Sequence, residues 1–421
     1  MSHVIRDSNG AEVGYGRWFT WNNTPKVTEA RNTAGRGPFF DETLRDGLQA
    51  PNVRNPTSAQ KLALVDHAVA AGVGAADLGF PGAGGGALKE CIEIARHIDA
   101  NGYKLAQGYA GRTHVADVGA ICEVAQAAGV SVDAYIFIGI SPIRQYVEDW
   151  DFGSIRRNIQ DSARMCSQEG VNFVLVLEDT VRCPPQLLRQ IYDVAIDVGV
   201  RRMCLCDTVG AALPSGTETL VRWSIRYFAD RGHPVDFEWH GHNDRGLALA
   251  NSLTALSAGC VLVHGTILGI GERTGNASLD QLIVNSHLDE GAAYDLIALR
   301  KYCEFASEVL GTAIPHNYPA MGSDVFTTSA GVHAAAILKA HTKGDVLAKD
   351  AVYSSVPASL FGRTQEVIID ASSGASNVRY WLATNGVGDD PVLVGKILRH
   401  AKGSNTPLTD DLIRQIIAAT D

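Results

Sequence analysis

One feature constrains this chain above all others: short apolar runs, rich in β-branched and aromatic residues, recur about every thirty residues from residue 38 onward. The segments between these runs have helical periodicity. Strands that alternate with helices in this way predict an α/β fold, a (β/α)8 TIM barrel. The eight runs are PFFDETL, GVGAADLGF, YKLAQGY, SVDAYIFIGI, VNFVLVLED, RRMCLCDT, VDFEWHGH and CVLVHGTILGI.

Signals for helix ends agree with this interpretation. Thr57 is predicted to cap a helix together with Gln60 in a capping box, and Gly72 is predicted to end it. Two later helices are predicted to end at Gly199 and Gly259. A doubly wound open sheet is the alternative. It usually has fewer strands, and no G-x-G-x-x-G phosphate fingerprint follows the first run.

The predicted boundaries divide the chain into three parts. Residues 1–37 form a polar N-terminal arm with a few aromatic residues, which packs either on the barrel or on a partner chain. Residues 38–289 form the barrel. Residues 290–421 form a mainly helical C-terminal subdomain of ordinary domain size.

Charge and composition argue against several classes of protein. The net charge of -10 disfavours binding to nucleic acids or to anionic membranes. No signal peptide and no apolar run long enough to span a bilayer is present. The 8 cysteines are scattered through apolar segments, so we expect reduced thiols and a cytoplasmic protein. Cys204 and Cys206 are interpreted as core residues rather than a zinc pair, because no second pair has ligand spacing.

Polar side chains gather where the predicted strands end, which is where the functional residues of a TIM barrel lie. So many charged groups at equivalent strand ends would each need a buried partner if they were only structural. They are Asp41, Arg45, Asp46, Gln49, Asp77, Glu178, Asp179, Asp207, Thr208, His240, His242, Asn243, Asp244, Glu272, Arg273 and Asn276.

His240 and His242 lie two residues apart and so share one face of a strand. With Asp46, from a strand two positions around the ring, they make a suitable set for a divalent cation with open positions. The alternative is a pair of structural histidines. Arg45 either projects over a substrate, where it would stabilise charge developing on an oxygen, or makes a surface salt bridge with Glu42 or Asp41.

Two other strand ends allow two interpretations each. Glu178 and Asp179 are either functional or cap the next helix. Glu272 either takes part in catalysis or pairs with Arg273. Gly271 and Gly275 suggest a loop whose backbone approaches another group closely.

Five motifs together carry a resemblance: DETLRDGLQ, EDTVR, DTVG, HGHND and GIGERTGN. Over residues 38–375 the chain resembles the pyruvate-carboxyltransferase-like barrel family. That family contains 2-isopropylmalate, homocitrate and citramalate synthases and 3-hydroxy-3-methylglutaryl-CoA lyase. GSDVFTTSAGVHAAAILK and YSSVPASLFGR resemble the C-terminal subdomain of the synthases, and GIGERTGN lacks the cysteine of the lyase loop. The synthase branch is therefore expected, with a metal-dependent C–C lyase or aldolase as the alternative.

The resemblance implies a Claisen-type condensation of an acyl-CoA, expected to be acetyl-CoA, with a 2-oxo acid. Thioester hydrolysis would then give a 2-alkylmalate-type product and CoA, an acyltransferase reaction of amino-acid biosynthesis. A divalent cation (Mg²⁺, Mn²⁺ or Zn²⁺) would act as Lewis acid. The implied metal ligands are Asp46, His240, His242 and Asn276; the implied catalytic residues are Arg45, Glu178, His333, Tyr353 and Glu272; the implied substrate-binding residues are Gln49, Asp77, Arg144 and Thr208.

The resemblance also implies a homodimer, in which the segment with His333 and Tyr353 completes the partner's active site. No amino-acid-sensing domain is expected after the subdomain. Some positions depart from the family pattern: Thr328, Ser329 and Ala330 precede His333, and Asp77 replaces a glutamate. Arg144 replaces a histidine of isopropylmalate synthases, and either binds a second carboxylate or faces solvent.

Overall fold

The structure is a computed structural model that describes residues 5–6, 12–13, 37–290 and 294–419. Most of the predicted arm, residues 1–37, lies outside the described residues. Within it, the short strands β1 (Ile5–Arg6) and β2 (Glu12–Val13) pair antiparallel. The chain divides into two compact units, Met1–Tyr294 and Asp295–Asp421, which are described separately.

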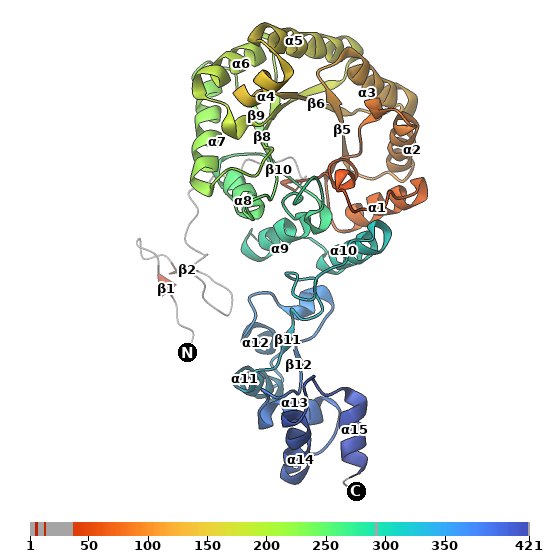
Figure 1. Ribbon diagram of the computed structural model, residues 1–421, viewed down its shortest axis with the longest axis vertical. Helices are drawn as coiled ribbons and strands as arrows, with labels where there is room; N and C mark the ends of the chain where they lie inside the picture. Colours follow the sequence, from red (N-terminus) through yellow and green to blue (C-terminus); the bar gives the residue numbers. More distant parts are fainter. Residues whose placement is uncertain (1–4, 7–11, 14–36, 291–293, 420–421) are drawn as a thin grey trace. The chain divides into compact units, whose positions relative to one another are not determined.

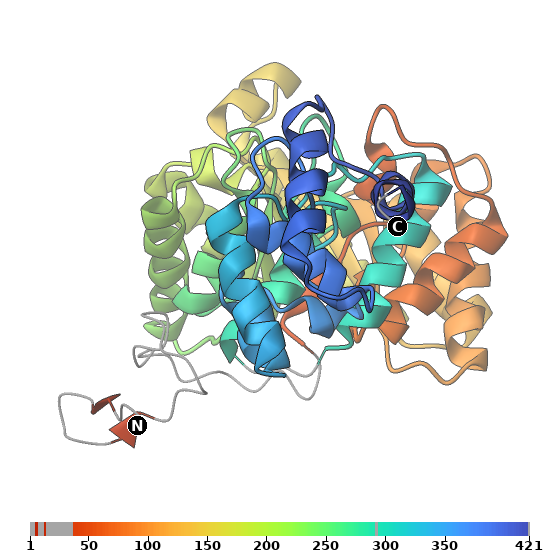
Figure 2. The same cartoon turned by 90° about the horizontal axis from the view of Figure 1, so that it is seen from below.

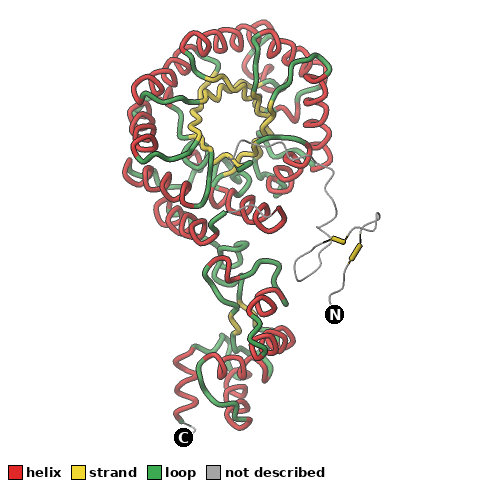
Figure 3. The backbone as a smooth tube through the Cα atoms, turned by 180° about the vertical axis from the view of Figure 1, so that it is seen from behind, coloured by secondary structure: helices red, strands yellow, loops and turns green. Residues whose placement is uncertain are grey.

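The first unit is the predicted barrel (Figures 1 and 3). Its parallel strands close in the order β10-β3-β4-β5-β6-β7-β8-β9, so the first strand of the ring pairs with the last. Each predicted run supplies one strand, and the (β/α)8 prediction is confirmed. The strands are β3 (Phe39–Asp41), β4 (Ala75–Asp77), β5 (Ala106–Arg112), β6 (Asp133–Gly139), β7 (Asn172–Glu178), β8 (Arg202–Asp207), β9 (Asp236–Gly241) and β10 (Leu262–Gly265).

Helices cover the outside of the ring, and Figure 2 shows them from the side. They are α1 (Ser58–Ala70), α2 (Ala87–Ala100), α3 (Val115–Ala128), α5 (Phe152–Glu169), α6 (Pro185–Asp197), α7 (Pro214–Ala229), α8 (Ala248–Ala258) and α9 (Leu279–Glu290). The short helix α4 (Pro142–Glu148) follows β6 and buries none of its residues. The predicted capping box is present: Thr57 accepts a hydrogen bond from Gln60 N, and Gln60 Oε1 accepts one from Thr57 N.

The barrel interior is filled partly by apolar side chains and partly by a buried charged array. Phe40, Tyr135 and Val174 belong to one apolar cluster between the strands. Arg202 enters the same interior and donates to Glu238 and to the hydroxyl of Tyr135. A guanidinium in this position is tolerated because carboxylates pair with it.

The second unit is mainly helical, as predicted. Its helices are α10 (Leu296–Leu310), α11 (Gly331–Thr342), α12 (Val346–Ala351), α13 (Ala375–Thr384), α14 (Pro391–Lys402) and α15 (Asp410–Ala418). A core of its own joins α13, α14 and α15 through Trp381, Ile397 and Ile413. Two short strands, β11 (Thr327–Thr328) and β12 (Glu366–Val367), pair in parallel. No helix among the described residues is long and apolar enough to cross a membrane.

Candidate active site

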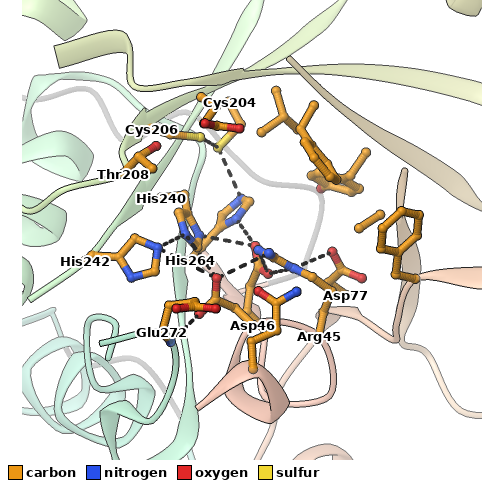
Figure 4. A pocket seen from close by; sticks show the side chains of 18 of the residues that line it. Arg45, Asp46, Asp77, Cys204, Cys206, Thr208, His240, His242, His264 and Glu272 are labelled. Atoms are coloured by element: carbon orange, nitrogen blue, oxygen red, sulfur yellow. Dashed lines mark hydrogen bonds and ion pairs between the residues drawn. The ribbon is translucent and has the colours of Figure 1, made fainter. Parts of the chain in front are cut away.

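Side chains from the carboxyl ends of the strands surround a cavity of about 290 Å³ within the barrel unit (Figure 4). Most of the residues singled out in the sequence line it. The lining includes Arg45, Asp46, Gln49, Asp77, Glu178, Thr208, His240, His242, Glu272 and Arg273. It also includes Glu42, Phe80, Ala110, Tyr135, Phe137, Val176, Cys204, Cys206 and His264, to which the sequence had assigned no role in a site.

Asp46, His240 and His242 come together as a potential cation site. The Nε2 atoms of the two histidines are 3.3 Å apart, and Asp46 Oδ2 lies 3.9 Å from His240 Nε2 and 3.7 Å from His242 Nε2. All three side chains are buried. The strand order explains the meeting, because β10 lies between β9, which carries His240, and β3, which leads to Asp46.

The electrostatics of these ligands suit a cation. Burial, and then the neighbouring His240, lower the pKa of His242 to about 4, so its imidazole is neutral at neutral pH. Burial opposes the negative charge of Asp46, but Arg45 and the two histidines lower its pKa below the usual value. An ionised carboxylate and a neutral imidazole are the states in which such groups bind a metal.

Asn276 reaches the same place through an isolated bridge between its backbone and that of His242. Its Nδ2 donates to Asp46 Oδ1 (2.6 Å) and to Ile270 O (3.1 Å). Its Oδ1 is buried and has no hydrogen-bond partner within the described structure. A buried acceptor without a donor is costly. A cation next to Asp46 would satisfy it, so the residues present fit a metal.

The loop before Asn276 approaches the site as closely as its glycines suggested. A Cβ on Gly271 would lie 2.5 Å from Asp46 Oδ1 and 2.2 Å from Asn276 Nδ2, and its φ is +144°. A Cβ on Gly275 would lie 1.8 Å from Gly269 O. Only glycine leaves room for this loop beside the ligands.

Arg45 pairs with Glu42, yet the pair lies in the cavity wall and not on the surface. Nε of Arg45 donates to Glu42 Oε2 (2.7 Å), and Nη1 donates to Asp46 Oδ2 (3.2 Å). Asp77 Oδ2 lies 3.5 Å from Nε. The surface alternative for Arg45 is therefore wrong: burial opposes its charge, but these three carboxylates hold the guanidinium in place and raise its pKa.

Glu42 and His264 are two ionisable residues of the lining to which sequence reasoning gave no role in the site. His264 Nδ1 lies 2.7 Å from Glu42 Oε1, and its Nε2 lies 2.9 Å from Glu238 Oε2. Burial opposes the charge of His264, but the hydrogen bonds to the two carboxylates raise its pKa to about 9. An imidazolium has no lone pair for a metal, so the group Glu42, His240 and His264 is a support for the site rather than a second cation site.

Two acids in the cavity have raised pKa values. Burial, and then the negative charge of Glu42, raise the pKa of Asp77 to about 7, although Arg45 acts in the opposite direction. Burial also raises the pKa of Glu178, again against the effect of an arginine, Arg144. Asp77 is thereby suited to exchange protons near neutral pH.

Several polar residues at the rim have partners that the sequence did not specify. Thr208 accepts a hydrogen bond from Asp179 N (2.8 Å). Asp179 makes no cap; it pairs with Arg182, and its φ is 61°. Arg273 pairs with Asp244 (2.9 Å), a partner that the sequence did not suggest.

Arg144 lies outside the lining of the cavity. Nη1 of Arg144 is 2.9 Å from Glu148 Oε1 and Nε is 3.6 Å from Glu178 Oε1. In the second unit, the rings of His333 and Tyr353 stack at 3.8 Å between centroids. Thr328 Oγ1 lies 3.4 Å from His333 Nδ1, so this departure from the family pattern contacts the histidine.

The described geometry can be set beside known proteins. The sequence profile of the HMGL-like family matches residues 37–307, more than half of the chain. The chain belongs to the HMGL-like family. The prediction of this family is thus confirmed, and with it the prediction of an enzyme.

Individual relatives point to the synthase branch of the family. A 2-isopropylmalate synthase of Methylacidiphilum infernorum is 33% identical over 314 residues, 73% of this chain and 61% of that protein. This chain therefore spans less than two thirds of that relative. A homocitrate synthase of Pyrococcus horikoshii is 29% identical over 375 residues, 89% of this chain and 97% of that protein. The solved structure of the HMG-CoA lyase of Bacillus subtilis shares the barrel fold, with a TM-score of 0.55 and 20% identity over 67% of this chain and 96% of that one.

Proposed function

We propose that this HMGL-like protein condenses an acyl-CoA with a 2-oxo acid at a divalent cation and releases CoA by thioester hydrolysis. The observation that carries this proposal is the meeting of Asp46, His240 and His242 with Arg45 in one cavity. Relatives named 2-isopropylmalate, homocitrate and citramalate synthases support it.

Asp46, His240, His242 and the amide oxygen of Asn276 would hold the cation. When bound, the cation supplies Lewis-acid polarisation of the carboxylate and keto oxygens of the 2-oxo acid. Arg45, fixed by its carboxylates, would donate hydrogen bonds to the oxygen that becomes negative as the new C–C bond forms. The Thr208 hydroxyl, which accepts from Asp179 N, keeps its own proton to donate to the substrate carboxylate.

A base must remove a proton from the methyl group of the acyl-CoA before its carbon attacks the keto carbon. Glu178 is the candidate within the barrel, because it lines the cavity and burial raises its pKa. We assign the stacked pair His333 and Tyr353 to the same acid–base group. Water then attacks the thioester carbonyl, the C–S bond breaks, and a carboxylate and free CoA leave.

The catalytic assembly is proposed to be a homodimer in which the second unit of each copy completes the partner's cavity. Exposed apolar side chains are consistent with a partner for this unit: Val332, next to His333 in the sequence, is 74% exposed, and Tyr353 of the stacked pair is 49% exposed. On the barrel unit, Tyr146 of α4 is 83% exposed.

The proposal is tested by thiol release from acetyl-CoA with a panel of 2-oxo acids, before and after treatment with EDTA. We expect release that depends on a 2-oxo acid, disappears with EDTA and returns with Mn²⁺. Absence of CoA release with every 2-oxo acid would contradict the proposal, and C–C cleavage of a 3-hydroxyacyl-CoA without free CoA would favour the lyase alternative.

Metal content gives a second, independent measurement. Elemental analysis of the purified protein should find a stoichiometric divalent ion, which the variant His242→Ala loses. His341→Ala is a suitable control, because His341 packs against Tyr380 within the second unit. Equal metal content in His242→Ala and the unaltered protein would remove the ligand assignment.

A further inference from the structure

Part of the cavity lining is apolar and aromatic. Phe137 of β6 and Val176 of β7 are partners in the strand register, and both are half-buried although the residues on either side of each along the strand are buried. They are less buried because they line the cavity. The ring of Phe80 meets that of Phe137 edge to face, with centroids 6.0 Å apart.

The positive charges of the cavity already have partners. Among the described residues that line it, the guanidinium groups belong to Arg45 and Arg273, and there is no lysine. Arg45 is held by carboxylates of Glu42, Asp46 and Asp77, as described above. Arg273 donates to both oxygens of Asp244 (2.9 and 3.0 Å) and to a backbone carbonyl.

Two carboxyl groups would repel an additional anion here. Asp77 and Glu178 line the cavity together with the apolar side chains. Arg144, the residue with the potential to bind a second carboxylate, does not line the cavity. It forms ion pairs with Glu148 (2.9 Å) and Glu178 (3.6 Å), and its Nε has no hydrogen-bond partner among the described residues. A second carboxylate on the substrate would therefore be buried without a cation, which is strongly unfavourable.

From this geometry we infer that the protein takes 2-oxo acids whose side chain is apolar, and that the side chain lies against Phe80, Phe137 and Val176. This inference rests on the proposed function. It separates the chain from enzymes that take a dicarboxylic 2-oxo acid, because in this cavity no unpaired arginine of the barrel is available to a distal carboxylate.

A matched pair of substrates tests the inference. In 5-methyl-2-oxohexanoate an isopropyl group replaces the distal carboxylate of 2-oxoglutarate at equal chain length. With acetyl-CoA and Mn²⁺, kcat/KM should be higher for the apolar acid by about 100-fold or more. Equal values, or a preference for 2-oxoglutarate, would overturn the inference.

Calorimetric titration of both acids into the Mn²⁺-loaded protein distinguishes failure of the inference from failure of the proposed function. Tighter binding of the apolar acid without CoA release would support the inference and overturn the condensation. Tighter binding of 2-oxoglutarate, or binding of neither acid, would overturn the inference whatever the reaction.

Variants at the apolar wall make the test specific. Phe137→Arg places a guanidinium in the wall and should lower the preference for the apolar acid at least about tenfold. If that variant does not fold, Phe137→Ala should lower kcat/KM for the apolar acid about tenfold and leave 2-oxoglutarate a poor substrate. Phe173→Ala is the control, because Phe173 is half-buried on β7 and does not line the cavity. An equal change of the ratio in this control would contradict the assignment.

A second inference comes from the hydrogen bonds around Glu42. One oxygen, Oε2, accepts from Nε of Arg45, and the other, Oε1, lies 2.7 Å from Nδ1 of His264. Oε1 also lies 3.3 Å from Nδ1 of His240, a close electrostatic contact in which this nitrogen makes no hydrogen bond to a described residue. Glu42 is buried. It lies between His240, a proposed metal ligand, and Arg45, the group proposed to stabilise the oxyanion. A carboxylate at the far nitrogen of a ligating histidine fixes which ring nitrogen carries the proton and how the ring is turned.

We infer that Glu42 is a positioning residue, held by His264, that orients both the imidazole of His240 and the guanidinium of Arg45. The array continues from His264 to Glu238 and from there to Arg202 and Asp133. Because Glu42 supports two functions at once, its loss should affect cation binding and turnover together.

Titration of the metal-free full-length protein with Mn²⁺, followed by calorimetry, is the readout that does not depend on activity. Glu42→Gln should weaken Mn²⁺ binding about 10- to 100-fold and lower kcat more than it changes KM. Asp133→Asn is the matched control from the far end of the array and should leave Mn²⁺ affinity unchanged. If Glu42→Gln does not fold, His264→Asn should still weaken Mn²⁺ binding about threefold to tenfold. Unchanged affinity in both, or an equal loss in Asp133→Asn, would overturn the inference.

Discussion

At the scale of single residues, Asp77 shows how burial sets the charge of the site. Its folded-state pKa of about 7 is above its unfolded value, so the folded protein binds the proton more tightly. The free energy of unfolding therefore falls as pH rises from about 4 to 7, while Asp77 is forced to ionise.

Asp77→Asn should remove this dependence, since asparagine resembles the protonated carboxyl group. We expect the EDTA-treated variant to be more stable than the unaltered protein at pH 8, by up to a few kcal/mol, with the difference vanishing near pH 4. Urea unfolding at pH 4.5, 6 and 8 measures it. A difference that is constant with pH would mean that Asp77 is ionised throughout.

A second prediction at this scale concerns the contribution of Asn276 to cation binding. Its unpartnered Oδ1 should contribute to cation binding, so Asn276→Ala is expected to weaken Mn²⁺ affinity about tenfold. Asn285→Ala is a fair comparison, because Asn285 donates to a carbonyl of its own helix α9. Competition with a fluorescent chelator measures both, and equal affinities for the two variants would exclude Asn276 as a ligand.

At the scale of elements, the loop between η5 (Ile267–Gly269) and Asn276 is shaped to pass beside the ligands. Gly271→Ala should collide with Asp46 and Asn276 and abolish stoichiometric metal binding, because these atoms cannot move away without leaving the site. Gly199→Ala offers a control: its φ is also positive (+73°), but a Cβ there meets nothing within 4 Å. The control should lose about 1 kcal/mol of stability and keep its metal. Metal retained in Gly271→Ala would contradict the described loop.

Periodicity and strand order account for what the sequence could predict at this scale. The two histidines follow from the alternation along β9, and Asp46 follows from the neighbouring positions of β3 and β10. Glu42 and His264 could not be predicted, because their contact joins positions 222 residues apart through side-chain packing. In the sequence, Glu42 is a glutamate three residues before an arginine, and His264 is a histidine within an apolar run, so neither position indicates a functional role.

At the scale of the whole molecule, the proposed dimer predicts that two inactive proteins restore each other. Asp46→Ala removes one of the proposed metal ligands of the barrel unit. His333→Ala removes the proposed acid–base residue of the second unit. If each active site combines units of two copies, random exchange of subunits should restore about a quarter of full activity. Thiol release before and after mixing and refolding measures this. No recovery, with mixed dimers demonstrated by tagged subunits, would place both units of one chain in one site.

Closure of the ring has a consequence for how the protein is made. Glu42 meets His264 only after the 222 residues that separate them have left the ribosome, which takes about ten to forty seconds at ordinary rates of synthesis. Until then the two carboxylates that follow β3, Glu42 and Asp46, lack the histidine side chains that surround them in the folded barrel. The proposed cation site is therefore completed late in synthesis, when the barrel itself is nearly complete.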